Sequence, residues 1–453
     1  MRLVICLLLL FTSLVSAARQ SIKNKSGYVI RSVHVITMKD EKIKRNQDVV
    51  ITNGVIIAIG ATGKIKHDKN FQVIDGRGKY LMPGLAEMHA HVPPVDNLQP
   101  MKEVVMLFAL KGITTIRGML GHPRHLELRK KLESGEIIGP RLVTSGPSFN
   151  GNSVPEPSVG VAMVKNQKNA GYDFLKIHPG LSTASFDSIA ATAKAVHIPF
   201  AGHVPFAVGI WHALTSGYTT IDHMDGFVEG LVPGIETMSE QETGLFGLYI
   251  SQMADTTKIP ALLKGLRENQ VWVVPTQSLA ERWFAPDKDA ESLSRMPEMK
   301  YMSQATLSNW VQTKENMMRN ARYKAGDVNH LIQLRRKLIY ACNNYGVGLL
   351  LGSDAPQVFN VPGFSAHHEL QYLVDAGLTP YEALRTATSN VGVFLKREDL
   401  GTIAIGSVSD LLLLEGNPLE DISQTRNIAG VMLGKKWMSK EFIVTELKKL
   451  EKN

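Results

Sequence analysis

Residues 85–94 read LAEMHAHVPP, the segment that is most informative about the fold. It is an apolar, strand-like run that follows Pro83-Gly84 and stops at Pro93-Pro94. His89 and His91 are two positions apart, so on a strand both imidazoles point to the same face and can reach one metal ion. In a chain with 14 histidines such a pair is a weak signal alone. Its position on a strand makes it a candidate metal-binding element.

Four further residues with metal-binding chemistry stand at or just past the ends of other apolar runs. They are Lys176 in GYDFLKIHPG, His203 in FAGHVP, His223 in IDHMDG and Asp354 in LLLGSDAP. Taken singly, His203 or His223 is more simply explained as a structural histidine. Their matching positions favour one common site with His89 and His91.

The middle of the chain alternates between short apolar runs and helical patterns. In SFDSIAATAKAV, for example, Phe186, Ile189 and Ala193 share one helix face, and AVGIWHALTSG ends at Gly217 as a helix C-cap would. The apolar runs are GLAEMHA, ITTIR, RLVTS, DFLKI, IPFAGH, TTIDH, VWVVPT and VGLLLGSD. This alternation predicts an α/β fold, a (β/α)8 TIM-type barrel over residues 81–399, with its chemistry at the C-terminal ends of the strands.

Both ends of the mature chain are β-rich. Residues 26–80 and 400–446 contain alternating or β-branched runs, and Asn53-Gly54 is typical of a hairpin turn. We therefore expect a small composite β-sandwich domain made from both segments. Two long connections, 226–270 and 278–345, are expected to form either a lid or pocket wall, or extra helices packed on the barrel.

The first residues, MRLVICLLLLFTSLVSAARQ, predict a signal peptide over residues 1–18. Arg2 precedes an apolar stretch, and small residues follow for cleavage. A membrane anchor is the alternative, but about a dozen apolar residues fall short of the ~20 that span a bilayer. We expect an exported protein, periplasmic or extracellular, with no stable membrane insertion after cleavage.

Composition narrows the partners. The net charge is +8, but the basic residues are dispersed in short clusters that fit solvated helix faces, so no nucleic-acid partner is expected. After cleavage Cys342 is the one cysteine left, which excludes an intramolecular disulfide and a multi-thiolate zinc site. The expected partner is a small-molecule substrate, and the sequence leaves the oligomeric state open, with a homo-oligomer as one option.

Lys176 is the unusual member of the set, because a protonated amine repels metal ions. If it is desolvated and reacts with carbon dioxide, it becomes an anionic carbamate whose two oxygens can bridge two ions. The alternative is an inward lysine that forms a salt bridge with Asp354 or Asp173. Asp354 itself ends an apolar run, and a buried carboxylate there needs a partner such as a cation.

The chain resembles the amidohydrolase superfamily from about residue 26 to 446. The segments that carry the resemblance are LMPGLAEMHAHV, GYDFLKIH, AGHVPFAVGIWHALTSGYTTIDHMDG, LLLGSDAP and GTIAIGSVSDLLLLEGNPLEDI. SGEIIGPRLVTSG is typical of the imidazolonepropionase-like and Xaa-Pro-dipeptidase-like branch.

The resemblance implies a binuclear site. His89, His91 and Asp354 would hold one divalent ion and His203 and His223 the other, with carboxylated Lys176 and a hydroxide bridging them. Asp354 would be the catalytic residue, taking the hydroxide proton and passing it to the leaving nitrogen. Zinc is the default metal for these ligands, and manganese, iron and cobalt fit the same set.

The chain also departs from the family pattern. Gly118 follows ITTIR where an acidic residue is common, and PSFNGNSVPEPSVG replaces a glycine- and histidine-rich stretch. These loops shape the substrate pocket, so the substrates of the branch do not carry over. His178 and Arg117 are candidates for substrate contact, with a surface or core-edge role as the alternative.

These observations predict an exported binuclear-metal amidohydrolase that cleaves an amide or other C–N bond of a small peptide-like or N-acyl substrate. A lactonase or phosphoesterase on the same scaffold is an alternative, because the same hydroxide attacks those bonds. A third hypothesis is a non-catalytic metal-binding barrel, but the complete set of candidate ligands argues against it.

Overall fold

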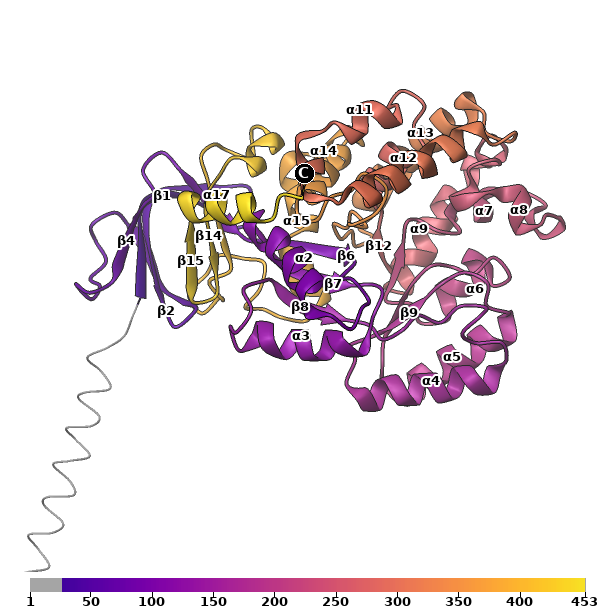
Figure 1. Ribbon diagram of the computed structural model, residues 1–453, viewed down its shortest axis with the longest axis horizontal. Coiled ribbons are helices and arrows are strands. Elements are labelled where there is room, and N and C mark those ends of the chain that lie inside the picture. Colours follow the sequence, from indigo (N-terminus) through magenta and orange to yellow (C-terminus); the bar gives the residue numbers. More distant parts are fainter. Residues whose placement is uncertain (1–26, 453) are drawn as a thin grey trace, which may run out of the picture.

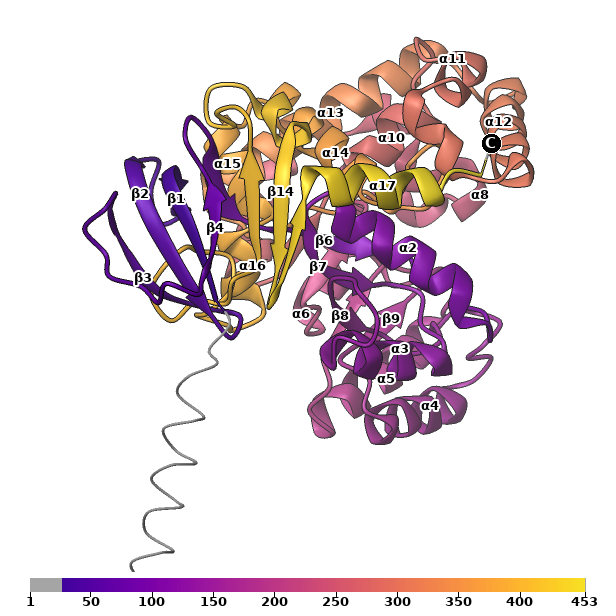
Figure 2. The same ribbon diagram turned by 60° about the vertical axis from the view of Figure 1, so that its left-hand side comes forward.

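A computed structural model describes residues 27–452 of the 453-residue chain. The predicted signal peptide, residues 1–18, lies outside the described residues. A β-rich part occupies one side of the molecule, and a larger part made of short parallel strands and helices occupies the other (Figures 1 and 2). Within the described range no helix has the length and apolar character needed to cross a membrane.

The N- and C-terminal segments share one sheet. Its order is β15-β14-β13-β5-β1-β2-β3, with β4 paired to β1, and Figure 2 shows the indigo and yellow strands side by side. The hairpin between β2 and β3 turns at Asn53 and Gly54, which both have positive φ, as the sequence predicts. The strands are β1 (Gly27–Ile36), β2 (Ile43–Thr52), β3 (Val55–Ala61), β4 (Gln72–Asp75), β5 (Tyr80–Pro83), β13 (Leu411–Leu414), β14 (Ile428–Leu433) and β15 (Lys436–Ser439).

The middle of the chain contributes seven short parallel strands in two sheets, ordered β6-β7-β8 and β12-β11-β10-β9. Six of them are buried at every residue or nearly so, because helices and loops cover both faces. The strands are β6 (Leu85–Ala90), β7 (Ile113–Gly118), β8 (Arg141–Thr144), β9 (Leu175–Ile177), β10 (Phe200–Gly202), β11 (Thr220–Asp222) and β12 (Trp272–Val274).

Isolated parallel bridges join these two sheets at both ends. Ser145 pairs with Phe174 between β8 and β9, and Leu349 pairs with Val273 beside β12. Ala355 then pairs with Ala90 at the end of β6. The eighth predicted strand, VGLLLGSD, is therefore present as a segment with single bridges and not as a regular strand. Its backbone leaves the extended conformation at Asp354, where φ is 64°.

Helices follow most of the parallel strands. The two helices predicted explicitly correspond to α5 and α6, and Gly217 follows the C-cap of α6 with φ 97°. The α-helices of the described residues are α2 (Leu98–Leu110), α3 (Pro123–Glu133), α4 (Pro157–Ala170), α5 (Thr183–Ala195), α6 (Gly209–Thr215), α7 (Phe227–Leu231), α8 (Glu240–Thr243), α9 (Ile259–Glu268), α10 (Gln277–Trp283), α11 (Ala290–Ser294), α12 (Gln304–Arg319), α13 (Ala325–Tyr345), α14 (Phe364–Asp375), α15 (Pro380–Thr386), α16 (Ser389–Phe394) and α17 (Lys440–Lys449).

The second long connection, 278–345, forms helices that pack on the parallel-strand part. Its aromatic and methionine side chains enter a separate apolar cluster, where Tyr301 and Trp310 meet Val358 and Phe359. The Trp310 and Phe359 rings are 5.9 Å apart at their centroids. Of the two expectations for this connection, extra packed helices describe these residues.

Candidate metal centre

Five of the six predicted ligand residues lie within the parallel strands or directly after them, and Asp354 follows the segment that pairs through single bridges. Lys176 is within β9 and His89 within β6, while His203 and His223 directly follow β10 and β11. The side chains of Lys176 and His89 are 0% and 1% exposed, so this is an interior site and not a surface cluster.

His89, His91 and Asp354 form one compact group. Each offers a ligand atom, and these atoms lie within 4.8 Å of one another. His91 Nε2 is 2.5 Å and His89 Nε2 is 3.3 Å from Asp354 Oδ1. Two imidazole nitrogens and a carboxylate oxygen at this spacing suit a divalent transition metal. Within residues 27–452, this is the set of three that meets the geometry of a metal site.

Backbone pairing explains how residues 263 positions apart meet. The amide of Met88 donates to Leu351 O at 2.7 Å, and the amide of His91 donates to Ala355 O at 2.8 Å. The amide of Asp354 donates back to His89 O at 2.9 Å. The segment 351–355 therefore runs along the end of β6 and holds the carboxylate against both histidines.

A buried carboxylate fixes the same loop from below. Glu87 accepts from the Ser353 amide at 2.5 Å and from the Ser353 hydroxyl at 2.8 Å. Burial raises the pKa of Glu87 to about 8, with the two Ser353 contacts opposing the shift. Both carboxylate oxygens of Glu87 are engaged by Ser353, so Glu87 holds the loop that carries Asp354 and is not one of the candidate ligands.

His203 and His223 form the second half of the site. Their ring centroids are 4.5 Å apart, and His223 lies 4.4 Å from the His89 ring. His203 Nδ1 is 2.9 Å from Asp225 Oδ2, and His223 Nδ1 is 2.9 Å from Thr276 Oγ1. A histidine whose Nδ1 is engaged in this way is oriented to ligate through Nε2.

Two of the candidate ligands have an unusual backbone. His223 and Asp354 have φ values of 62° and 64°, a left-handed conformation that costs non-glycine residues about 1–3 kcal/mol. The surrounding hydrogen bonds hold both residues there; His223 N, for example, donates to Val274 O at 2.8 Å. Strain of this kind concentrates at functional sites, where it sets the direction of a side chain.

Lys176 Nζ is fully buried and has no hydrogen-bond partner among the described residues. Burial lowers the pKa of Lys176 to about 8, and the nearby carboxylates only partly oppose this. The neutral amine is the form that reacts with carbon dioxide, so the environment suits a carbamate. The alternative interpretation, a salt bridge from Lys176 to Asp354 or Asp173, differs from the structure in its partner. Lys176 Nζ lies 3.8 Å from Asp222 Oδ2, and Asp173 pairs with Arg129.

Asp222 is the residue that sequence reasoning missed. Its Oδ2 lies 3.1 Å from His89 Nδ1 and its Oδ1 accepts from Arg117 at 3.1 Å. The carboxylate therefore orients His89 from behind, as carboxylates commonly do for metal-ligating histidines. Its place directly before His223, in IDH, was the available signal.

Arg117, predicted as a candidate for substrate contact, is 2% exposed and has another role. Its guanidinium donates to Met88 O at 2.7 Å, Thr220 Oγ1 at 3.0 Å and Asp222 Oδ1 at 3.1 Å. These contacts join β6, β7 and β11 beneath the site and neutralise Asp222. The other candidate, His178, is half-buried with its ring 5.1 Å from His203, on the same side as the ligands.

The donor set fits divalent metal ions on this structure alone. Four imidazoles, one carboxylate and a buried amine converge in a site with 0–14% exposed side chains. Lys176 Nζ is buried without a hydrogen bond within the described structure. Buried polar atoms are rarely left in this state, so the site is built around a group that would satisfy them.

The chain belongs to the amidohydrolase family, whose model matches residues 80–438. This confirms the resemblance drawn from the motifs and makes the chain a hydrolase of that family. A curated relative, ochratoxinase from Aspergillus niger, is 22% identical over 403 residues, covering 83% of this chain and 79% of the relative. Dihydroorotase from Carboxydothermus hydrogenoformans is 38% identical over 65 residues, 14% of either chain.

Solved structures share the fold. A bottromycin amidohydrolase aligns with a TM-score of 0.71 and 19% identity, covering 94% of this chain and 89% of that one. An Xaa-Pro dipeptidase with bound methionine gives a TM-score of 0.65 at 19% identity, covering 91% and 100%. The A. niger ochratoxinase gives 0.64 at 17%, covering 92% and 96%. These likenesses imply a TIM-barrel-type fold with a β-rich domain.

Proposed function

We propose that the protein is an exported, metal-dependent amidohydrolase that cleaves an amide or other C–N bond of a small peptide-like or N-acyl substrate. The observation that carries this is the convergence of four histidines, Asp354 and Lys176, whose buried Nζ makes no hydrogen bond among the described residues. The names of the similar proteins, a dipeptidase, a bottromycin amidohydrolase and an ochratoxinase, support a substrate of this kind.

The proposal includes the finer architecture. The two parallel sheets and the 349–355 segment form one closed (β/α)8 barrel over residues 81–399, supported by the bridges at Ser145, Leu349 and Ala355. The proposed composite β-sandwich domain, residues 26–80 and 400–446, is supported by the sheet that both segments share, in which β1 pairs with β4 along its first half and with β5 along its second.

The proposed centre is binuclear. His89, His91 and Asp354 would hold one divalent ion and His203 and His223 the other, and Lys176, once carboxylated, would be a ligand common to both. Zinc is the expected metal, with manganese, iron or cobalt as alternatives. Metal ions held by these residues would supply a nucleophile at neutral pH and would polarise the scissile carbonyl.

The chain's own residues orient the ligands and move the proton. Asp354 accepts the proton of the attacking nucleophile on its carboxylate and delivers it to the leaving nitrogen. Asp225, Thr276 and Asp222 keep the rings of His203, His223 and His89 in place. The near-complete burial of His89, Lys176 and His223 excludes bulk water, which strengthens electrostatic interactions in the site.

Metal analysis combined with a substrate panel tests the function. The purified protein is expected to carry two equivalents of divalent metal and to hydrolyse dipeptides or N-acyl amino acids faster than lactones and phosphoesters. Lys176→Ala should lose the activity. A protein that binds one ion or fewer and tolerates Lys176→Ala would refute the binuclear mechanism, and preference for lactones or phosphoesters would assign the other bond.

Export is tested separately. The full chain expressed in a bacterial host is expected in the periplasm or medium, with its N-terminus near residue 19 by mass spectrometry. A cytoplasmic product that begins at residue 1 would contradict the proposed signal peptide.

A further inference from the structure

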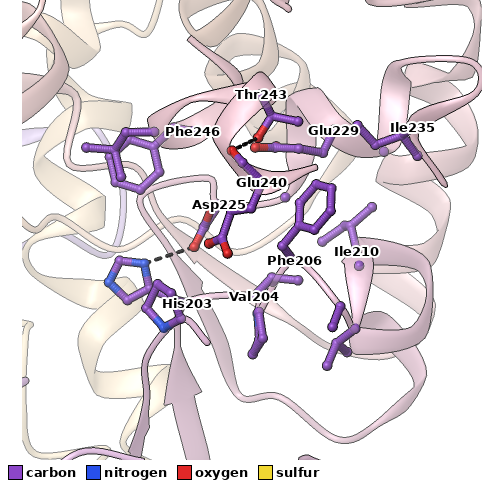
Figure 3. A pocket seen from close by; sticks show the side chains of 18 of the residues that line it. His203, Val204, Phe206, Ile210, Asp225, Glu229, Ile235, Glu240, Thr243 and Phe246 are labelled. Carbon is purple, nitrogen blue, oxygen red and sulfur yellow. Dashed lines mark hydrogen bonds and ion pairs between the residues drawn. The ribbon is translucent and has the colours of Figure 1, made fainter. Parts of the chain in front are cut away.

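A cavity of about 660 Å³ adjoins the metal centre on the His203 side. Figure 3 shows its walls, which come from the loop after β10, the start of α6, α7 and residues 235–246. His203 and Phe246 belong to both places: the Phe246 ring is stacked on His223 with centroids 5.3 Å apart. A substrate whose scissile bond lies at the metal centre can therefore extend into this cavity.

The cavity is unusual in charge. Four carboxylic acids line it, and in the described part of the chain no lysine or arginine does. The acids are Asp225, Glu229, Glu236 and Glu240, and Figure 3 shows the Asp225, Glu229 and Glu240 side chains inside the pocket. Asp225 is engaged by His203. The three glutamates have no ion-pair partner among residues 27–452.

Glu229 has one carboxyl oxygen without a partner among the described residues. Its Oε2 atom is buried and makes no hydrogen bond within the described structure. Burial, followed by the charge of Asp225, raises the pKa of Glu229 to about 8. An acidic side chain at a cavity wall in this state is stabilised by a bound cation, because the cation replaces the lost hydration and offsets the repulsion.

The rest of the wall decides which cation. The carboxylates do not form a three-ligand metal set within the described residues, unlike His89, His91 and Asp354. The wall between them is apolar and aromatic, with Phe206, Ile210, Trp211 and Phe246. Aromatic faces attract organic cations, and a volume of this size accommodates an amino-acid side chain rather than a bare ion.

We propose that this cavity is the subsite for a cationic group of the substrate, a primary ammonium or a guanidinium carried on an aliphatic stem, with Glu229 as its main counter-charge. The proposal rests on the proposed amidohydrolase function and narrows it to substrates with a basic side chain or amine. Glu240 stands at the exposed edge of the cavity, where it guides the cation inward.

Matched substrates test the preference. Alanyl-arginine and arginyl-alanine are compared with alanyl-citrulline and citrullyl-alanine, which have nearly the same shape without the charge. One charged hydrogen bond predicts that kcat/KM is about 10- to 100-fold higher for the arginine member of at least one pair. Glu229→Gln should remove most of this preference, and the surface variant Glu268→Gln, from an exposed pair with Lys264, should keep it.

Binding of butylguanidinium and butylurea, measured calorimetrically on the metal-loaded protein, separates this inference from the function. The wild type should bind butylguanidinium at least about tenfold more tightly, and Glu229→Gln should not. Hydrolysis of both members of each pair at equal rates would overturn the subsite and leave the function standing. No amide hydrolysis, but charge-selective binding lost in a folded Glu229→Gln, would keep the subsite and refute the function.

Discussion

Gly202 is the last residue of β10, directly before His203, and is the position where one added methyl group should disturb the metal centre most. Its φ is 129°, in the region that only glycine adopts readily. A Cβ there would lie 2.4 Å from Ile177 O and 2.9 Å from Lys176 Cδ. Both neighbours belong to β9, so Gly202→Ala should push His203 and Lys176 apart.

The expected cost has two parts. The backbone conformation costs about 1–3 kcal/mol for a non-glycine residue. The overlap with β9 adds about 1–3 kcal/mol, because Ile177 O is backbone inside a buried strand and cannot move freely. Gly171→Ala is the matched control: its φ is 87°, but a Cβ there meets nothing within 4 Å, so only the backbone part applies.

We would test this by measuring thermal unfolding, metal content and steady-state kinetics of both variants. Gly202→Ala should melt at a lower temperature than Gly171→Ala, carry fewer metal equivalents and lose most of its activity. Gly171→Ala should keep the metal content and kcat/KM of the wild type. If the two variants lose stability equally and Gly202→Ala stays fully loaded and active, then Gly202 does not set the position of Lys176 and His203.

Three further predictions follow from the same contacts. Asp354→Asn should lower kcat by about 10²- to 10⁴-fold in a protein that still folds, because it removes the proton acceptor; steady-state kinetics would contradict this if most activity remained. Arg117→Met should lower the free energy of unfolding by about 3–5 kcal/mol, because Asp222 stays buried without the guanidinium that pairs with it. The control Arg129→Met removes an ion pair with the partly exposed Asp173 and should cost about 0–1 kcal/mol, so equal melting temperatures of the two variants would refute the difference. Cys342 should resist a disulfide-exchange reagent at pH 8 until the protein unfolds, because the thiol is 0% exposed and burial raises the pKa of Cys342 to about 12; rapid native labelling would contradict the packing.

The strand ends were predictable because each is marked locally. Apolar runs such as ITTIR and TTIDH are short and bounded by turns, and a polar residue after such a run lies at the carboxyl end of the strand. The last run was less predictable. VGLLLGSD has strand composition, yet Asp354 turns into a left-handed conformation, so the segment pairs through single bridges. The predicted ligand position of Asp354 is nevertheless kept, since its carboxylate faces His91.

The residues that hold the candidate ligands in place could not be predicted from local sequence patterns. Arg117 and Asp222 are 105 positions apart, and Glu87 and Ser353 are 266 apart. Each pair exists only because particular strands are neighbours, and no local pattern states which ones. Arg117 was therefore assigned a possible substrate contact, although burial leaves it no access to a substrate.

The surroundings of Glu229, at the edge of the site, could not be predicted from the sequence either. In the sequence it stands in DGFVEGLVPG, where one acid among apolar residues looks like the solvated side of a short helix. Its Oε2 is buried, and residues 235–246, which contain only short helical turns, line the same cavity. Phe246 adopts φ 57° to place its ring against His223, so the same segment closes the metal centre and the acidic pocket. Substrate choice in this chain thus depends on a connection without periodic pattern, while the chemistry depends on strand ends that the pattern reveals.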